Sequence, residues 1–67
     1  MKLTVKYGNL DEEKTEELRS LLEGYNFNLI RIGEGPMLFV EANRDDMLKI
    51  LEIATSFSYQ DLMLRHS

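Results

Sequence analysis

The chain opens with a strict alternation of apolar and polar residues over residues 2–7. Leu3, Val5 and Tyr7 fall on one side of an extended chain, and the intervening lysines and threonine fall on the other. This period of two is typical of a strand with one buried and one exposed face. A glycine and an asparagine follow, so we predict that the first strand ends there.

A helical period replaces the alternation over residues 11–23. Asn9 or Asp11 can cap this helix, and acidic residues crowd its first turn, where the helix dipole favours them. Gly24 stands where many helices end in a left-handed conformation. The predicted buried stripe consists of apolar side chains three and four residues apart: Leu18, Leu21, Leu22 and Tyr25.

Two further strands are predicted over residues 27–32 and 37–42. The first is apolar on both faces, and residues 33–36 between them form a short glycine-containing turn without further function. Such a connection indicates an antiparallel hairpin. In the second of these strands, Leu38 and Val40 share the face that we expect to be buried, while Met37 and Phe39 share the other.

Asn43 is the expected cap of a second helix that runs to about Phe57, and a fourth strand over residues 59–65 closes the chain. The element order is then β-α-β-β-α-β. It predicts an α+β, ferredoxin-like split βαβ fold, with a four-stranded antiparallel sheet and both helices on one face. The predicted core comprises Leu3, Val5, Leu18, Leu21, Leu22, Leu38, Val40, Leu51, Ala54, Leu62 and Leu64.

Sixty-seven residues predict a single domain over residues 1–67. The sequence has no cysteine and one histidine, so we expect no metal site. We also expect no cofactor and no catalytic residues, because no nucleophile–base pair and no glycine-rich phosphate loop is present. The N-terminus lacks the apolar stretch of a signal peptide, and no run approaches the roughly 20 apolar residues of a membrane span. We therefore expect a cytoplasmic protein that is not an enzyme and does not bind membranes.

Three segments resemble the RNA-recognition motif, an RNA-binding family with the ferredoxin-like fold. Residues 5–10 are similar to its first-strand motif, residues 15–22 to its first helix, and residues 39–41 to the end of its third-strand motif. In that family, aromatic side chains on the open sheet face stack on bases. The resemblance places Lys6, Met37 and Phe39 at those positions, so this sequence departs from the pattern at two of the three.

The net charge of −4 is concentrated in the first helix. Residues 11–23 hold six acidic and two basic residues, whereas the rest of the chain has six of each. We predict that these carboxylates form a surface that binds a basic, nucleic-acid-binding protein, by mimicry of nucleic acid. The alternative is a solvated helix side that only keeps the protein soluble. The predicted partner-binding residues are Glu12, Glu13, Glu16, Glu17 and Glu23.

Apolar side chains exceed what one core requires, because those of the second helix sweep more than half of its circumference. Exposed apolar patches commonly mark partner sites, so we predict a second interface, most simply a homodimer. The alternative is that the first helix covers this flank. The residues predicted for self-association, or for an alternative binding face, are Met37, Phe39, Met63, Ile53 and Phe57.

Three functions are therefore open. The leading hypothesis is a protein-binding inhibitor with an acidic helix surface, and small acidic chains of this kind resemble host-takeover and anti-defence inhibitors of bacteriophages. The second is a binder of single-stranded nucleic acid through Phe39, which the acidic net charge opposes, so we expect no direct nucleic-acid binding. The third is a dimerising regulatory module.

Overall fold

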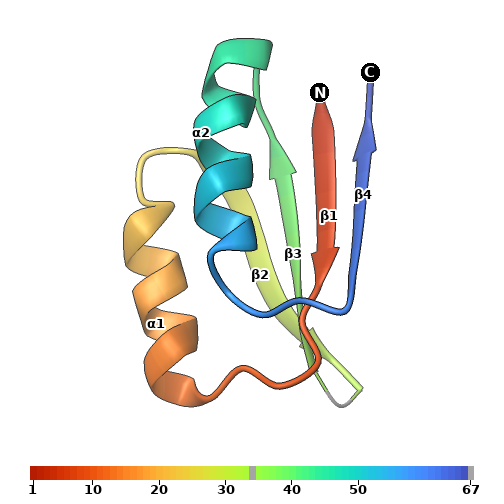
Figure 1. Ribbon diagram of the computed structural model, residues 1–67. Helices are drawn as coiled ribbons and strands as arrows, with labels where there is room; N and C mark the ends of the chain where they lie inside the picture. The colour runs from red at the N-terminus through yellow and green to blue at the C-terminus, as the bar shows by residue number, and fades with distance from the viewer. Residues whose placement is uncertain (34, 67) are drawn as a thin grey trace.

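The computed structural model describes residues 1–33 and 35–66, with the side chain of Ile32 excluded. The order of its helices and strands confirms the prediction of an α+β, ferredoxin-like fold (Figure 1). The elements are, in chain order, β1 (Lys2–Lys6), α1 (Glu12–Leu21), β2 (Asn26–Ile32), β3 (Gly35–Glu41), α2 (Arg44–Thr55) and β4 (Asp61–Arg65). The predicted turn at residues 33–36 includes Glu34, which lies outside the described residues, and its last two residues belong to β3.

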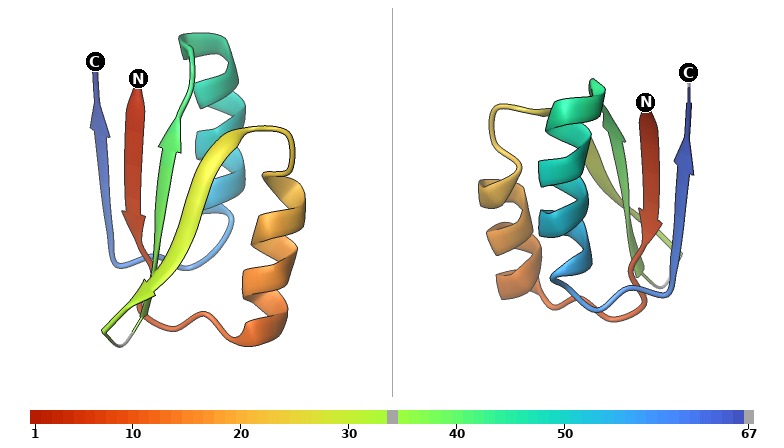
Figure 2. Two further views of the ribbon diagram at one scale, coloured as in Figure 1. Left: turned by 180° about the vertical axis from the view of Figure 1, so that it is seen from behind. Right: turned by 45° about the horizontal axis from the view of Figure 1, so that its top comes forward.

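The four strands form one antiparallel sheet in the order β2-β3-β1-β4. Both helices lie on the same face of this sheet, and the opposite face is open (Figure 2). Strands β2 and β4 are the two edges. β1 begins beside the end of β4, where Lys2 lies opposite Arg65.

The alternation in the sequence correctly predicted which face of each central strand is buried. Leu3, Val5 and Tyr7 of β1 and its continuation point towards the helices, as do Leu38 and Val40 of β3. Burial of these apolar surfaces is the main driving force for joining the two layers. The buried core consists of Leu3, Val5, Tyr7, Leu10, Leu18, Leu22, Leu29, Leu38, Val40, Met47, Ile50 and Ala54.

Each helix begins at a polar side chain that accepts a hydrogen bond from the first turn. Asp11 caps α1 and accepts from the backbone nitrogen of Lys14 at 2.8 Å. Asn43 caps α2 and accepts from the backbone nitrogen of Asp46 at 2.8 Å. These bonds satisfy backbone donors that have no partner within the helix.

The prediction that Leu21 is a core residue is wrong, because its side chain is 47% exposed. The buried side of α1 is formed by Thr15, Leu18 and Leu22, so the helix is rotated relative to the stripe read from the leucines alone. Thr15 can face the core because its hydroxyl donates to the carbonyl oxygen of Asp11 at 2.7 Å. Its polar atom is then satisfied within the helix itself.

Leu64 is also not a core residue, since it is 39% exposed, and Leu62 and Leu51 are only partly buried against the core. Leu62 and Leu64 belong to β4, at the edge of the sheet. In Figure 1, β4 lies beyond β1 on the side away from both helices. The inward direction of a side chain therefore does not guarantee burial at this edge.

Candidate functional site

A groove lies between α1 and the residues that follow α2. It has a volume of about 600 Å³. Its apolar part comes from Leu21 of α1, from the buried Leu10 and from Phe57, which is partly buried against the core. We call this surface the helix groove, and its lining residues are Asn9, Leu10, Asp11, Lys14, Glu17, Leu21, Ser56, Phe57 and Ser58.

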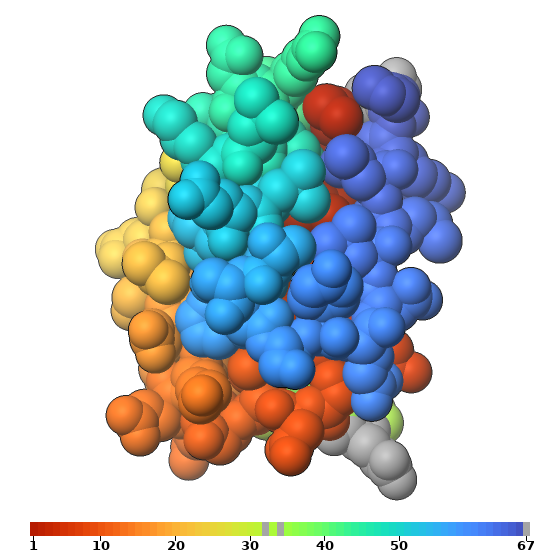
Figure 3. Space-filling view, viewed as in Figure 1, coloured from red at the N-terminus to blue at the C-terminus, as the bar shows by residue number. Residues whose placement is uncertain are grey.

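The groove follows from where the two helices end. Helix α2 stops at Thr55 and is capped by Ser56, so no further helical turn covers the side of α1 that carries Leu21. Figure 3 shows this side of the molecule, with α1 at the lower left and α2 in the centre. The exposure of Leu21 was not predicted, because helical spacing alone assigned this residue to the core.

The predicted acidic residues do not all line the same hollow of the surface. Glu12, Glu13, Glu16 and Glu17 are all exposed on α1, but the helix ends at Leu21. Glu23 follows that end and is exposed. Only Glu17 of the five lines the helix groove. Glu13 lies one turn before Glu17 on the same side of the helix, since residues four apart are neighbours there.

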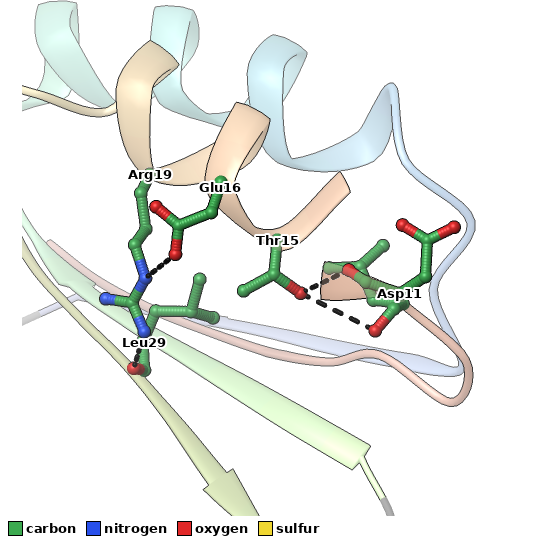
Figure 4. Close-up of polar contacts among 6 residues, drawn as sticks. Asp11, Thr15, Glu16, Arg19 and Leu29 are labelled. Carbon is green, nitrogen blue, oxygen red and sulfur yellow. Dashed lines mark hydrogen bonds and ion pairs between the residues drawn. The ribbon is translucent and has the colours of Figure 1, made fainter. Parts of the chain in front are cut away.

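Glu12 and Glu16 belong to a different surface, on the β2 side of α1. They line a smaller hollow of about 170 Å³ together with Arg19 and Arg31. The Nε atom of Arg19 lies 3.5 Å from Oε1 of Glu16, and its Nη2 atom donates to the carbonyl oxygen of Leu29 on β2 at 3.1 Å (Figure 4). Arg19 therefore links α1 to the sheet and offsets part of the acidic charge on this side.

The open face of the sheet carries a second hollow, of about 350 Å³. Phe39 of β3 is 36% exposed here, and its cross-strand neighbours are Asn28 of β2 and Thr4 of β1. The next row along the sheet is polar. Its members, in sheet order, are Asn26, Glu41, Lys2 and Arg65.

The charge on this open face differs in sign from that of α1. Its basic residues are Lys2, Lys6 and Arg65, and its acidic residues are Glu41 and Asp61, a net charge of +1. The acidic charge that dominates the whole chain therefore lies on the helix side. The amino-acid sequence could not show this separation, because it depends on how the strands are ordered.

The five residues predicted for self-association fall in two places. Met37, Phe39 and Met63 lie on the open sheet face, and Met63 is 56% exposed. Ile53 and Phe57 instead pack partly buried against the core, so the apolar sweep of α2 is largely accounted for within the fold. Of the apolar residues of α2, Leu48 is the most exposed, at 64%.

The described residues were also compared for groups that could hold a metal ion and for shifted pKa values. Among residues 1–33 and 35–66, no three His, Asp or Glu side chains lie close enough together to hold a metal ion. Burial raises the pKa of Tyr7 to about 12, but its hydroxyl donates to the carbonyl oxygen of Ala54 within the core.

In the described part of the chain, no helix combines the length and the apolar character that a membrane span requires.

Comparison with known proteins identified no relative of this chain. No protein-family model, no curated protein and no solved structure matches the chain. The helix groove and the open sheet face are therefore the candidate functional surfaces.

Proposed function

We propose that this chain is a non-enzymatic protein-binding module that engages a basic partner through the helix groove. The observation that carries the proposal is the position of Leu21, an exposed apolar side chain that lines a groove of about 600 Å³ together with Asp11 and Glu17. Binding sites commonly combine an apolar floor with a few polar groups that set orientation.

The charge around the groove specifies the chemistry of the partner. Asp11, Glu17 and the neighbouring Glu13 supply carboxylates, and Lys14 is the only basic residue of the lining. A partner segment with an apolar side chain for Leu21 and Phe57, flanked by lysine or arginine, complements this surface. The carboxylates would steer its approach and the apolar contact would hold it.

A basic surface of this kind is typical of proteins that bind nucleic acid. Occupation of such a surface by the acidic helix would exclude the phosphate backbone, which makes the chain an inhibitor by mimicry. This matches the resemblance to small acidic inhibitors of bacteriophages. The proposal includes a cytoplasmic location, where proteins that bind nucleic acid are available as partners.

The test begins with affinity capture from a bacterial lysate and continues with binding titrations of each captured protein. Two variants alter the groove, Leu21→Ser its floor and Glu13→Gln with Glu17→Gln its charge. A matched control alters exposed residues of α2, Leu48→Ser with Glu52→Gln. We expect each groove variant to weaken binding about ten-fold or more and the control to leave it unchanged.

A competition assay with DNA or RNA separates mimicry from simple binding. The parent chain should displace nucleic acid from the captured partner, and this displacement should weaken as ionic strength rises. If the groove variants bind and compete as well as the parent, the helix groove is not the binding surface. The carboxylates of α1 would then be only a solvated surface.

A second candidate function, binding of single-stranded nucleic acid, is favoured by the open sheet face. Phe39 provides one stacking platform, and Lys2 and Arg65 border the same hollow on a face of net charge +1. We rank it second, because one aromatic side chain and a small positive charge supply little of what such binders use.

Fluorescence anisotropy with a ten-nucleotide oligo-uridine or oligo-thymidine measures this second function directly. We expect a Kd weaker than about 10 μM near physiological salt. Tighter, salt-sensitive binding that is lost in Phe39→Ala and retained in Leu48→Ala would place the nucleic-acid function first.

A further inference from the structure

Strand β4 has one free side. In the sheet order β2-β3-β1-β4 it pairs only with β1, and in Figures 1 and 2 no other described element lies along its outer side. Edge strands are templates for pairing with another chain unless charge, proline or a bulge protects them. Residues 61–65 of β4 carry charges only at their two ends, Asp61 and Arg65.

The hydrogen bonds of β1 show which backbone groups of β4 face outwards. The backbone nitrogen of Tyr7 donates to the carbonyl oxygen of Pro36 at 3.0 Å. The backbone nitrogen of Ala42 donates to the carbonyl oxygen of Met1, also at 3.0 Å. Odd-numbered residues of β1 therefore exchange bonds with β3, and even-numbered residues face β4.

The β4 partners of these even-numbered residues are Asp61, Met63 and Arg65. The N–H and C=O groups of Leu62 and Leu64 consequently point away from β1, to the free side. In agreement, the backbone nitrogen of Leu62 donates to the side chain of its own neighbour, Asp61, at 2.9 Å.

The order of side chains in β4 is self-complementary. The sequence Asp-Leu-Met-Leu-Arg, paired antiparallel with itself around Met63, places Asp61 opposite Arg65 and Leu62 opposite Leu64. This register also places the outward backbone groups of Leu62 opposite those of Leu64, so the hydrogen bonds and the side chains favour the same alignment. Pairing centred on Leu62 or on Leu64 would also form backbone hydrogen bonds between the two strands. It would, however, place a charged residue opposite Met63: Asp61 in the first case and Arg65 in the second.

Two features of β4 are unfavourable in the isolated chain, and this pairing would reduce both. Arg65 lies directly opposite Lys2 of β1, and like charges in that arrangement are unfavourable. Met63 is 56% exposed and Leu64 is 39% exposed, so apolar surface remains uncovered on both faces of the strand. A second copy would bring Asp61 to Arg65 and cover part of both side chains.

We propose that β4 pairs with β4 of a second copy about a two-fold axis at Met63, which joins the two sheets into one of eight strands. This axis is perpendicular to the sheet, so both helix grooves face the same side of the dimer. The proposal does not depend on the proposed function, because no residue of the helix groove belongs to β4.

Charge reversal at the ends of β4 tests the register. Sedimentation equilibrium should show that the parent chain dimerises, with a Kd of roughly 100 μM or tighter, since a single strand edge is a small interface. Asp61→Arg alone and Arg65→Asp alone place like charges opposite each other, and each should weaken the dimer about ten-fold or more. The double variant restores opposite charges and should recover the affinity of the parent to within about three-fold.

Thermal unfolding of dilute samples checks that all three variants remain folded. A parent chain that stays monomeric at about 1 mM, or a double variant no better than the single ones, would overturn the proposal.

Disulfide trapping supplies a second readout, because the chain has no cysteine of its own. Met63→Cys places two thiols opposite each other at the two-fold axis, in a pair whose Cα atoms lie about 4.5 Å apart. With oxidised glutathione as the oxidant, we expect this variant to form a covalent dimer at least about ten times faster than Leu48→Cys, an exposed control on α2. Phe39→Cys reports on face-to-face stacking of the open sheets. Fast trapping of Phe39→Cys with slow trapping of Met63→Cys would reject β4 pairing.

Discussion

The side chain of Tyr7 continues the buried face of β1 and reaches the end of α2. Its hydroxyl donates to the carbonyl oxygen of Ala54 at 2.7 Å. Ala54 lies in the last turn of α2, where carbonyl groups have no partner within the helix. One phenol therefore fills the core and satisfies a helix end, which the alternation of the first strand could not indicate.

Ionisation of Tyr7 should make the protein unstable to alkali. Burial raises its pKa to about 12, whereas the unfolded chain ionises near 10. This contribution to stability is fully present below pH 10 and is lost as pH rises towards 12, by on the order of 2–3 kcal/mol. Urea unfolding between pH 8 and 11 measures it. Tyr7→Phe should flatten the decline, whereas Tyr59→Phe, at an exposed site, should follow the parent.

Gly35 is required by a close approach of two strands. A Cβ atom at this position would collide with the backbone carbonyl oxygen of Tyr7, which cannot move without disturbing β1. Gly35→Ala should therefore destabilise the fold by about 1–3 kcal/mol. Gly8→Ala is the control, because the atoms nearest to its Cβ belong to the flexible side chain of Gln60. Equal unfolding midpoints in urea for the two variants would contradict this assignment.

At the scale of elements, local sequence accounts for where the helices begin and end. Asn43 was predicted as the cap of α2, and Asp11 was one of two caps predicted for α1, the other being Asn9. Gly24 follows α1 with a φ of +96°, as its predicted role in ending the helix requires. The rotation of α1 was not predictable, since it depends on which sides the sheet and α2 cover.

Loss of the cap of α2 should measurably lower the stability of the fold. Asn43→Ala removes the acceptor for the backbone nitrogen of Asp46 and should lower the free energy of unfolding by about 1 kcal/mol. Asn43→Asp keeps an acceptor beside the positive end of the helix dipole and should be neutral or slightly stabilising. Urea denaturation monitored by circular dichroism compares the two. An alanine variant as stable as the parent would mean that solvent replaces the cap.

At the scale of the whole molecule, one small core supports all six elements. Domains of this size have a thin stability margin, so the loss of one central side chain has a large effect. The charge is separated between the layers, with the acidic surface on α1 and a face of net charge +1 on the open sheet. A charge substitution on one of these surfaces therefore leaves the charge of the other unchanged.

Leu38→Ala tests the dependence on the core. Leu38 is fully buried in a central strand, and large-to-small changes at such sites cost about 2–5 kcal/mol. We expect a substantial unfolded population at 25 °C, visible as a loss of dispersion in amide NMR spectra. Leu48→Ala should leave the spectrum folded, because Leu48 is 64% exposed. A well-dispersed Leu38→Ala spectrum with an unchanged melting temperature would show that the core can adjust around the cavity.

The sequence by itself determined the elements, their order and the buried face of the central strands, because these follow from residue spacing and from local hydrogen bonds. It also located the acidic charge in the first helix. Tertiary structure alone decided which of these residues share a surface. Leu21 became part of the helix groove because α2 ends beside it, and Leu64 became exposed because β4 is an edge. Lys2 and Arg65 meet only through strand pairing, which joins residues far apart in the chain.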